Sequence, residues 1–307
     1  MNTAFRAALT AALALPLAAP AAASSLMPVS QFGQQLQGQG LSPKFVFQKL
    51  HAHHSSKKPG HFSFPYGLGI DGAGNLYVGN IDSEKIVIVS PDYKVLTNTI
   101  TSGISTPVSV ATDTYGDVYV GNEGNNTVTK YNSSLSLVQT ITANTSAPYS
   151  IAVDQAQDVY LITGSGLAVD DPYGNSISSN IYSGSLDSVA VGGPNVYTFY
   201  NNFAAFGNIS VALRGAALQY LDGPLNSAVP AGSACSATQS FCWYDDSQNN
   251  VLYAASLPGY GYSVGLSYTP VGLAYDPVRN RVYIADPLNN AIHVYNASTL
   301  ALEKTII

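Results

Sequence analysis

A unit of short apolar runs separated by turns recurs along most of this chain, and its clearest copy is Thr269–Tyr295. Within that copy, β-branched and aromatic residues fill the runs Val271–Tyr275, Arg281–Ala285 and Ala291–Tyr295, and such residues favour strands. A fourth run follows at Leu300–Ile307. Because residues that favour tight turns separate the runs, each copy predicts a four-stranded antiparallel meander.

Earlier copies of the unit give the period of the repeat. They start at Pro65, Pro107 and Pro148. The second run of each contains a tyrosine at an equivalent place, namely Tyr77, Tyr119 and Tyr160. These tyrosines lie 42 and 41 residues apart. Such an interval is typical of a repeat architecture, in which each unit packs against its neighbours.

Two less regular copies lie between the third and the last. For the fourth copy we expect strands at Leu186–Val191, Asn195–Tyr200, Asn208–Leu213 and Ala217–Leu221. For the fifth we expect a long loop around Cys235, a second strand at Tyr253 and a shortened end at Gly259–Gly261.

The repeats predict a closed ring. Sheets of this kind are apolar on both faces, so an open stack leaves two apolar end faces, whereas a ring leaves none. Six copies fit between residues 65 and 307 at roughly forty residues each. The sequence therefore predicts an all-β fold, a six-bladed β-propeller of four-stranded antiparallel blades.

Residues 1–23 have the pattern of a secretory signal peptide. Arg6 supplies a positive start, Ala7–Leu17 a short apolar core and Ala21–Ala23 a small-residue cleavage site. The apolar core is too short to span a bilayer, and no later segment is continuously apolar for about 18 residues. We therefore expect a soluble chain, secreted to the periplasm or the cell exterior, with no membrane span.

Residues 24–64 are expected to form a flexible leader, because Ser24–Gly40 is rich in Gln, Gly and Ser and has no periodicity. Phe45–Leu50 could add an edge strand to a blade or pack beneath the ring. His51–His61 holds four of the five histidines, which are preferred ligands of Zn²⁺ and Cu²⁺. Lys57 and Lys58 lie in the same segment, so a solvated linker is the favoured interpretation.

The charge composition of the chain limits the kinds of molecule that it could bind. The chain carries 12 Lys plus Arg against 18 Asp plus Glu, a net charge of −6, which disfavours a phosphate-binding surface. We therefore expect no nucleic-acid partner. We also expect a monomer that holds no cofactor and no metal.

Cys235 and Cys242 are the two cysteines of the chain. In an exported protein such a pair favours a disulfide that closes a small loop over a redox or metal pair.

Acidic residues are a second set of candidate site residues. Asp71, Asp113, Asp154 and Asp276 recur at the end of the first run of their copies. They could form a ring of cation ligands, or each could cap its own turn by accepting backbone N–H groups. Repetition in every copy favours the turn interpretation. The pairs Asp170–Asp171 and Asp245–Asp246 could bind Ca²⁺, but solvated turns are the favoured interpretation.

The Pro65–Val78 segment, PYGLGIDGAGNLYV, and the final Pro270–Tyr295 unit resemble NHL-type repeats. The resemblance covers most of the chain from Pro65 onward. It implies a six-bladed propeller that serves as a platform for protein, glycan or nucleic-acid contacts, with a minority of relatives acting as lyases or lactone hydrolases.

Gluconolactonase-like enzymes are also similar in architecture, and they hold a divalent cation with Glu, Asn and Asp at the starts of the inner strands. The corresponding positions here are Tyr66, Val108, Tyr149, Asp187 and Val271, a mostly apolar and aromatic set. Propeller lyases use histidines of the central channel, and His293 falls in a third strand. No catalytic residue is therefore predicted.

Aromatic residues near the starts of the blades favour binding, since exposed tyrosines beside Asn and Ser make an adaptable contact surface. The predicted binding residues are Tyr66, Tyr149, Tyr182, Asp187, Tyr260 and Tyr262. We expect a non-catalytic scaffold for a protein or glycan. The alternative is a hydrolase or lyase that acts at the channel mouth with or without a metal.

Overall fold

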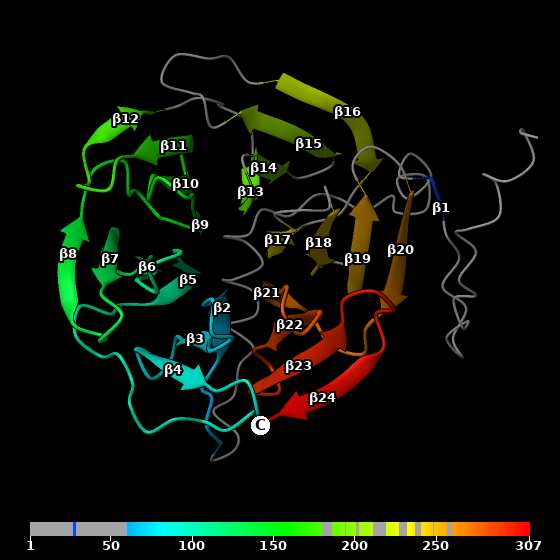
Figure 1. Ribbon diagram of the computed structural model, residues 1–307, viewed down its shortest axis with the longest axis horizontal. Helices are drawn as coiled ribbons and strands as arrows, with labels where there is room; N and C mark the ends of the chain where they lie inside the picture. Colours follow the sequence, from blue (N-terminus) through cyan, green and yellow to red (C-terminus); the bar gives the residue numbers. More distant parts are fainter. Residues whose placement is uncertain are drawn as a thin grey trace, which may run out of the picture.

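The computed structural model describes residues 27–28, 60–179, 186–193, 195–200, 203–210, 219–226, 232–236, 241–247, 249–256 and 260–307. These residues form six antiparallel sheets arranged around a common centre (Figure 1). The fold is an all-β propeller built from four-stranded antiparallel blades. No helix that could cross a membrane occurs in the described part of the chain.

The first three sheets follow the regular repeat. The first holds β2 (Pro65–Ile70), β3 (Leu76–Asn80) and β4 (Lys85–Val89), with single bridges from Ile86 to Ile100 and from Val89 to Val95. The second holds β5 (Pro107–Thr112), β6 (Val118–Asn122), β7 (Thr127–Tyr131) and β8 (Leu137–Ile141). The third holds β9 (Ser150–Val153), β10 (Val159–Thr163), β11 (Gly166–Asp170) and β12 (Ser176–Ser178).

The last three sheets complete the ring. The fourth holds β13 (Leu186–Gly192), β14 (Asn195–Tyr200), β15 (Phe203–Ser210) and β16 (Gln219–Asn226). The fifth holds β17 (Ser233–Cys235), β18 (Phe241–Asp246), β19 (Val251–Ser256) and β20 (Tyr260–Gly265). The sixth holds β21 (Val271–Asp276), β22 (Arg281–Asp286), β23 (Ala291–Asn296) and β24 (Leu302–Ile306).

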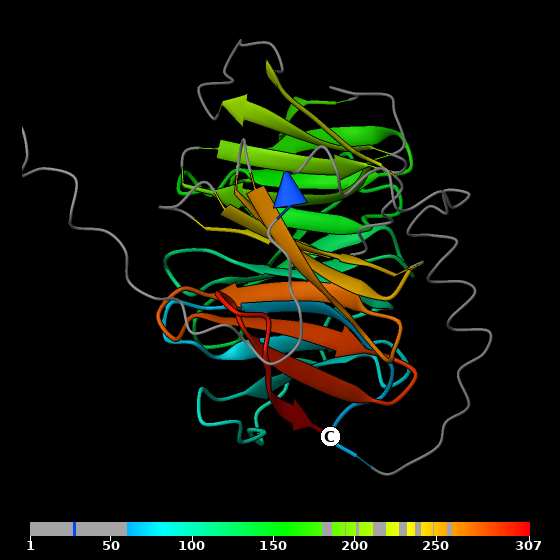
Figure 2. The same cartoon turned by 90° about the vertical axis from the view of Figure 1, so that its right-hand side faces the viewer.

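The first strand of each sheet lies nearest the centre of the ring, and the later strands lie progressively outward (Figure 1). We call β2, β5, β9, β13, β17 and β21 the inner strands. Figure 2 shows the ring from the side, with β1 (Met27–Pro28) paired to the outer strand β20. Residues 1–23 and Phe45–Leu50 lie outside the described residues.

The apolar core lies between adjacent sheets, as the closure argument requires. Tyr119 and Val128 of the second sheet pack against Ile151 and Leu161 of the third. Burying an aliphatic or aromatic side chain of this size stabilises the fold by about 1.5–3 kcal/mol. Each sheet is therefore held by the faces of its two neighbours.

The recurring aspartates cap their turns, which confirms the turn interpretation. Asp71 Oδ1 accepts the N–H groups of Ala73 and Asn75 at 3.0 and 2.8 Å, and Tyr77 donates its hydroxyl to Oδ2 at 3.1 Å. Asp113 and Asp154 make the equivalent bonds. The repeat tyrosine therefore recurs because its ring fills the core and its hydroxyl holds the capping aspartate.

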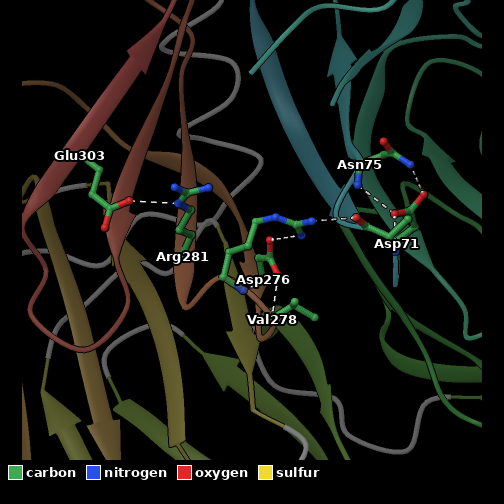
Figure 3. Close-up of polar contacts among 8 residues, drawn as sticks. Asp71, Asn75, Asp276, Val278, Arg281 and Glu303 are labelled. Carbon is green, nitrogen blue, oxygen red and sulfur yellow. Dashed lines mark hydrogen bonds and ion pairs between the residues drawn. The ribbon is translucent and has the colours of Figure 1, made fainter. Parts of the chain in front are cut away.

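In the sixth sheet an arginine replaces the tyrosine in this role. Arg279 Nη1 lies 3.0 Å from Asp276 Oδ2, and Arg279 Nη2 donates to the carbonyl oxygen of Ala73 at 3.3 Å (Figure 3). On the opposite side of the same two sheets, the N–H of Phe64 donates to Asn290 Oδ1 at 2.8 Å. The sixth sheet is therefore joined to the first by side-chain bonds, with no strand shared between them in the described residues.

The fifth sheet corrects the sequence-based expectation. Cys235 lies in the inner strand β17 rather than in a loop, and Tyr253 lies in the third strand β19. Trp243 of β18 takes the place of the repeat tyrosine. Residues 260–265 form a complete outer strand instead of a shortened end.

In the fourth sheet, the third strand starts at Phe203 rather than Asn208, and the fourth ends at Asn226 rather than Leu221. Pairing of Tyr200 with Phe203 closes the hairpin and fixes this earlier register. The first two strands of this sheet agree with the expectation, apart from one residue at the end of β13.

Gly272 provides a test of how closely the first and sixth sheets approach. Its φ is 59°, a conformation that favours glycine, and a Cβ at this position would overlap the carbonyl oxygen of Tyr66. We expect Gly272→Ala to destabilise the fold by at least about 2 kcal/mol. For a domain of this size, this corresponds to a fall in Tm of roughly 4–8 °C.

The measurement is thermal unfolding followed by circular dichroism, with Gly265→Ala as the matched control. A Cβ at Gly265 would have no atom within 4 Å, so this variant should unfold within about 1 °C of the original chain. Equal Tm values for the two variants would contradict the close approach.

Candidate functional site

Neighbouring inner strands lie closest to one another at a layer of small residues. By register this layer contains Gly67, Ser109, Ser150, Ser188, Gly232 and Gly272. Ser109 Oγ accepts the N–H of Ile151 at 2.9 Å, and Ser150 Oγ accepts the N–H of Val189 at 3.1 Å. The small side chains thus allow neighbouring inner strands to touch and hydrogen-bond each other.

In four of the inner strands, β2, β5, β13 and β21, the pairing with the next strand is irregular beside this small-residue layer. Register shifts occur between Pro65 and Leu68 in β2 and between Leu186 and Ser188 in β13. A β-bulge leaves a residue out of the ladder and re-aims its side chain, and bulges are frequent beside functional sites. Tyr66 and Asp187 occupy these positions in their strands, and Tyr149 precedes the corresponding residue of β9.

Asp245 lies on β18, the second strand of the fifth sheet, beside the small-residue layer. The N–H of Gly232 donates to Asp245 Oδ1 at 3.1 Å, and the N–H of Asp245 donates to the carbonyl oxygen of Gly232 at 3.2 Å. Gly232 immediately precedes Ser233, whose hydroxyl is hydrogen-bonded to that of Ser188. This chain of contacts places Asp245 and Asp187 at the same end of two adjacent sheets.

We call Tyr66, Tyr149, Asp187 and Asp245 the central cluster. Burial raises the pKa of the Tyr66 phenol, and the charges of Asp245 and Asp187 and the Tyr149 phenol raise it further. Such effects require the groups to lie within electrostatic reach of Tyr66. The structure therefore brings together three of the six predicted binding residues, with Asp245 in addition.

Asp187 is the least satisfied group of the central cluster. Its side chain is 1% exposed, and neither carboxyl oxygen has a hydrogen-bond partner among the described residues. Burial raises the pKa of this carboxyl well above its ordinary value. By contrast, the buried carboxylates of Asp113, Asp154 and Asp276 each accept several hydrogen bonds. A buried group that leaves its bonding capacity unused costs about 1–3 kcal/mol.

The other predicted binding residues are not part of the central cluster. Tyr262 lies on the outer strand β20 and donates its hydroxyl to the carbonyl oxygen of Ala297 at 3.0 Å. This hydrogen bond links the fifth sheet to the sixth, and within the fifth sheet the ring packs beside Phe241, with ring centroids 5.9 Å apart. Tyr260 belongs to the same strand, opposite Pro28, and Tyr182 lies outside the described residues.

Asp245 and Asp246 correct another expectation, because both are buried rather than solvated. Asp246 accepts the N–H and the side-chain amide of Asn249, a role that Asp286 repeats with Asn289. The sequence does carry a signal for this arrangement, because a polar residue ends the second strand of other sheets too. In the first and second sheets that residue is Asn80 and Asn122. Asp170 is likewise buried at the end of β11, and burial raises its pKa to about 6.

His293 lies in the third strand of its sheet, as the sequence predicted. Its Nε2 is 3.1 Å from Asp286 Oδ2, its Nδ1 is 3.1 Å from Thr305 Oγ1, and its ring stacks on Tyr268. These contacts hold the ring between outer strands of the sixth sheet. No group of three or more metal-ligating side chains occurs in the described residues.

The two cysteines form a disulfide between β17 and β18. Cys235 and Cys242 are directly opposite each other in this antiparallel pair. The bond therefore joins the inner strand of the fifth sheet to the strand that carries Asp245, and it supports one side of the central cluster.

Comparison with solved structures gives the class of fold. A streptogramin B lyase has a TM-score of 0.59 at 14% identity, covering 82% of this chain and 86% of its own. A catalytically inactive virginiamycin B lyase from Staphylococcus aureus with quinupristin has a TM-score of 0.57 at 13% identity. The match covers 83% of this chain and 88% of the lyase. Hydrazine synthase of Kuenenia stuttgartiensis has a TM-score of 0.59 at 14% identity. The match covers 76% of this chain and 84% of the synthase chain.

At these identities the likeness shows a β-propeller fold and no activity. No family model matches the chain, and no curated protein matches it. The resemblance to NHL repeats therefore stays a prediction.

The pH dependence of stability tests whether the buried carboxyl of Asp187 lacks hydrogen-bond partners. Because its native pKa lies above the unfolded value near 4, the native chain retains this proton longer, and stability falls as pH rises above that value. Asparagine does not titrate. We therefore expect Asp187→Asn to raise the free energy of unfolding by about 1–3 kcal/mol at pH 8 and by much less at pH 4.

Urea unfolding at both pH values measures this difference. Asp154→Asn is the matched control, since it alters a buried carboxylate that accepts bonds from two N–H groups and from Tyr160. The control should destabilise the fold at pH 8. If Asp187→Asn also destabilises it at pH 8, the account of Asp187 is wrong.

Proposed function

We propose that this chain is an exported, non-catalytic six-bladed propeller of the NHL-like kind, which binds a protein or glycan at the end of the ring where the inner strands begin. The observation that carries the proposal is Asp187, a buried carboxyl whose oxygens have no partner among the described residues. A ligand that donates hydrogen bonds there would remove the cost of leaving it unsatisfied.

Six sheets support the six-bladed ring. Each inner strand begins at the same end of its sheet, because the sheets repeat one antiparallel order. The described segments that lead into β2, β5, β9 and β21 therefore lie at that end, and binding residues are commonly carried by loops on a rigid scaffold.

The chemistry of the central cluster suits recognition. Tyr149 is half-buried, whereas Tyr66 is buried. Tyrosines supply large contact areas with little loss of conformational entropy, and the carboxyls of Asp187 and Asp245 are hydrogen-bond acceptors.

Export is supported by the signal-like residues 1–23 and by the Cys235–Cys242 disulfide, since disulfides persist in oxidising compartments. Mass spectrometry of the protein recovered from its native compartment tests this part. An amino terminus at Ser24 is the expected result, and an intact Met1 would contradict it.

Asp187 also favours a second candidate, an enzyme of the hydrolase or lyase class. A carboxyl whose pKa is raised by burial can act as a proton donor at neutral pH. The structural neighbours include a lyase, although the likeness covers the fold alone. Turnover of a bound ligand, followed by mass spectrometry of the products, separates this candidate from binding.

The binding proposal predicts a difference between two tyrosine variants. Tyr149→Ala removes an accessible ring of the central cluster and should weaken binding to immobilised glycans or peptides at least tenfold. Tyr173→Ala is the control, because Tyr173 is 81% exposed on a turn of the third sheet and should leave binding unchanged.

Arrays of glycans and peptides, read out with the original chain and both variants, provide the measurement. The proposal is overturned if Tyr149→Ala and the original chain bind alike, or if no probe binds at all.

A further inference from the structure

We propose that Asn125 is a site of N-linked glycosylation, at which an oligosaccharide is attached to the side-chain amide. The segment Asn125-Asn126-Thr127 has the Asn-x-Ser/Thr pattern, or sequon, that this modification requires. Because exported chains receive such glycans, the inference rests on the proposed export. It goes beyond the proposed binding function, since it assigns a covalent modification to one turn of the second sheet.

The sequon lies in the turn between β6 and β7, and neighbouring segments hold this turn in place. The N–H of Glu123 donates to the carbonyl oxygen of Thr106 at 3.1 Å. On the other side, the N–H of Ala147 donates to Asn126 Oδ1 at 2.8 Å, and Thr145 Oγ1 donates to the carbonyl oxygen of Asn126 at 2.6 Å. The turn is therefore fixed between the second and third sheets, which are neighbours in the ring (Figure 1).

The side chain of Asn125 can take a substituent without loss to the fold. The residue is exposed, and its Oδ1 accepts the hydroxyl of Thr127 at 2.7 Å. Among the described residues, Asn125 Nδ2 has no hydrogen-bond partner. An amide nitrogen carries two hydrogens, so a sugar carbon that replaces one of them breaks no hydrogen bond of the described chain. The hydroxyl that the sequon requires is already in contact with the acceptor amide.

The other sequons with described side chains begin at half-buried asparagines, namely Asn132, Asn144 and Asn296. Asn144 Nδ2 donates to Asp170 Oδ1 and to Ser176 Oγ, both at 2.7 Å. Asn296 Nδ2 donates to Glu303 Oε1 at 3.2 Å. A glycan on either nitrogen would compete with these hydrogen bonds.

Two further sequons are also poorly placed. Asn132 Oδ1 accepts the N–H groups of Ser134 and Ser136, both at 3.0 Å, which holds this amide within its own turn. Asn208 lies inside β15, a strand that pairs with β14 and β16. Of the sequons with described side chains, the one at Asn125 is therefore the one whose asparagine is exposed.

The charge beside Asn125 distinguishes it further. The residue two positions before the asparagine is Glu123 here, whereas the other four sequons of the chain have Lys130, Thr142, Phe206 and Val294 at that place. A carboxylate next to the acceptor can form a charge-assisted hydrogen bond with a basic side chain of the modifying enzyme. An enzyme that recognises this carboxylate would select Asn125 among the five sequons.

The reaction transfers a preassembled sugar chain. The donor class is an oligosaccharide linked to a polyprenyl diphosphate, and the catalyst is a membrane oligosaccharyltransferase. A bond forms between Asn125 Nδ2 and the anomeric carbon of the first sugar, while the bond from that carbon to the diphosphate oxygen breaks. The diphosphate leaves with the bonding electron pair, and the amide gives up one proton to a base of the transferase. Neither oxidant nor reductant is needed.

A glycan on Asn125 would lie at the end of the ring where the inner strands begin. Asn122 at the end of β6 pairs with Pro107 at the start of β5, so the turn after β6 belongs to that end. Asn126 bonds to Ala147, two residues before Tyr149. The attached oligosaccharide would therefore lie beside the segment that carries Tyr149 into the central cluster.

Mass spectrometry of the whole chain recovered from its native compartment tests the proposal. Electron-transfer fragmentation of its proteolytic peptides leaves the sugar on its residue and so locates it. We expect a glycan on Asn125 and none on Asn132, Asn144 or Asn296. An unmodified Asn125 overturns the inference, and so does a glycan found on the half-buried asparagines alone.

Variants of Thr127 separate the sequon from the fold. Thr127→Ser keeps the hydroxyl and should keep the glycan, whereas Thr127→Val keeps the shape of the side chain and should lose it. Ser134→Ala, which removes the neighbouring sequon at Asn132, is the matched control and should leave the glycan on Asn125 unchanged. A glycan that persists on Asn125 in Thr127→Val would contradict enzymatic N-glycosylation.

Glu123→Gln distinguishes two sources of the glycan. Loss of the glycan from this variant supports a transferase that recognises the acidic residue. Retention supports a transferase that recognises the Asn-x-Ser/Thr pattern alone. Both results require a glycan on Asn125 of the original chain, which is measured without any variant.

The amino terminus keeps this inference distinct from the proposed function. If the recovered chain begins at Ser24 and Asn125 is unmodified, export stands and the glycan inference alone is wrong. If Met1 is intact and Asn125 is unmodified, both fail. Binding to the arrays is measured separately with Asn125→Gln, which should unfold within about 1 °C of the unglycosylated original chain because Asn125 is exposed.

Discussion

The close approach of the inner strands is the constraint on which the rest of the molecule depends. Six strands meet near one axis only if the residues at their narrowest level are very small, and glycine and serine occupy that level. At Gly67 a Cβ would lie 2.7 Å from the Cα of Ser109, so even alanine would force the strands apart. The serines also connect sheets through hydrogen bonds to backbone N–H groups. The central cluster lies directly beside this layer, and the contacts between the inner strands hold it in place.

The Asp–Tyr pairs explain why the repeat is readable from sequence. The capping aspartate and the tyrosine six residues later form one unit, since the hydroxyl of Tyr160, for example, lies 3.1 Å from Asp154 Oδ2. Both residues are therefore required together in each regular copy. The regular sheets and the turn role of the aspartates could be predicted on this basis.

The fifth sheet could not be predicted in the same way, because its second strand carries Trp243 where the other sheets have tyrosine. Trp243 stacks on Tyr275 with ring centroids 4.1 Å apart and donates to the carbonyl oxygen of Ala297, so its partners lie in the next sheet. Tyr253, which keeps the expected residue type, lies one strand further out. Asp245 was assigned to a solvated turn for the same reason, since its buried place depends on this register. Tyr66, Tyr149 and Asp187 were named as binding candidates because each lies at the start of a run that the repeat identifies as an inner strand.

The seam between the first and sixth sheets has a mechanical consequence. Its polar contacts are side-chain bonds, Phe64 to Asn290 and Arg279 to Ala73, and no strand crosses it in the described residues. Every sheet thus keeps its own ladder of backbone hydrogen bonds if the seam parts. The buried apolar cluster that the two sheets share, which includes Tyr66, Val271 and Tyr283, is then what keeps the ring closed. Because Tyr66 belongs both to this apolar cluster and to the central cluster, a substitution that weakens the seam should loosen the central cluster before any strand is lost.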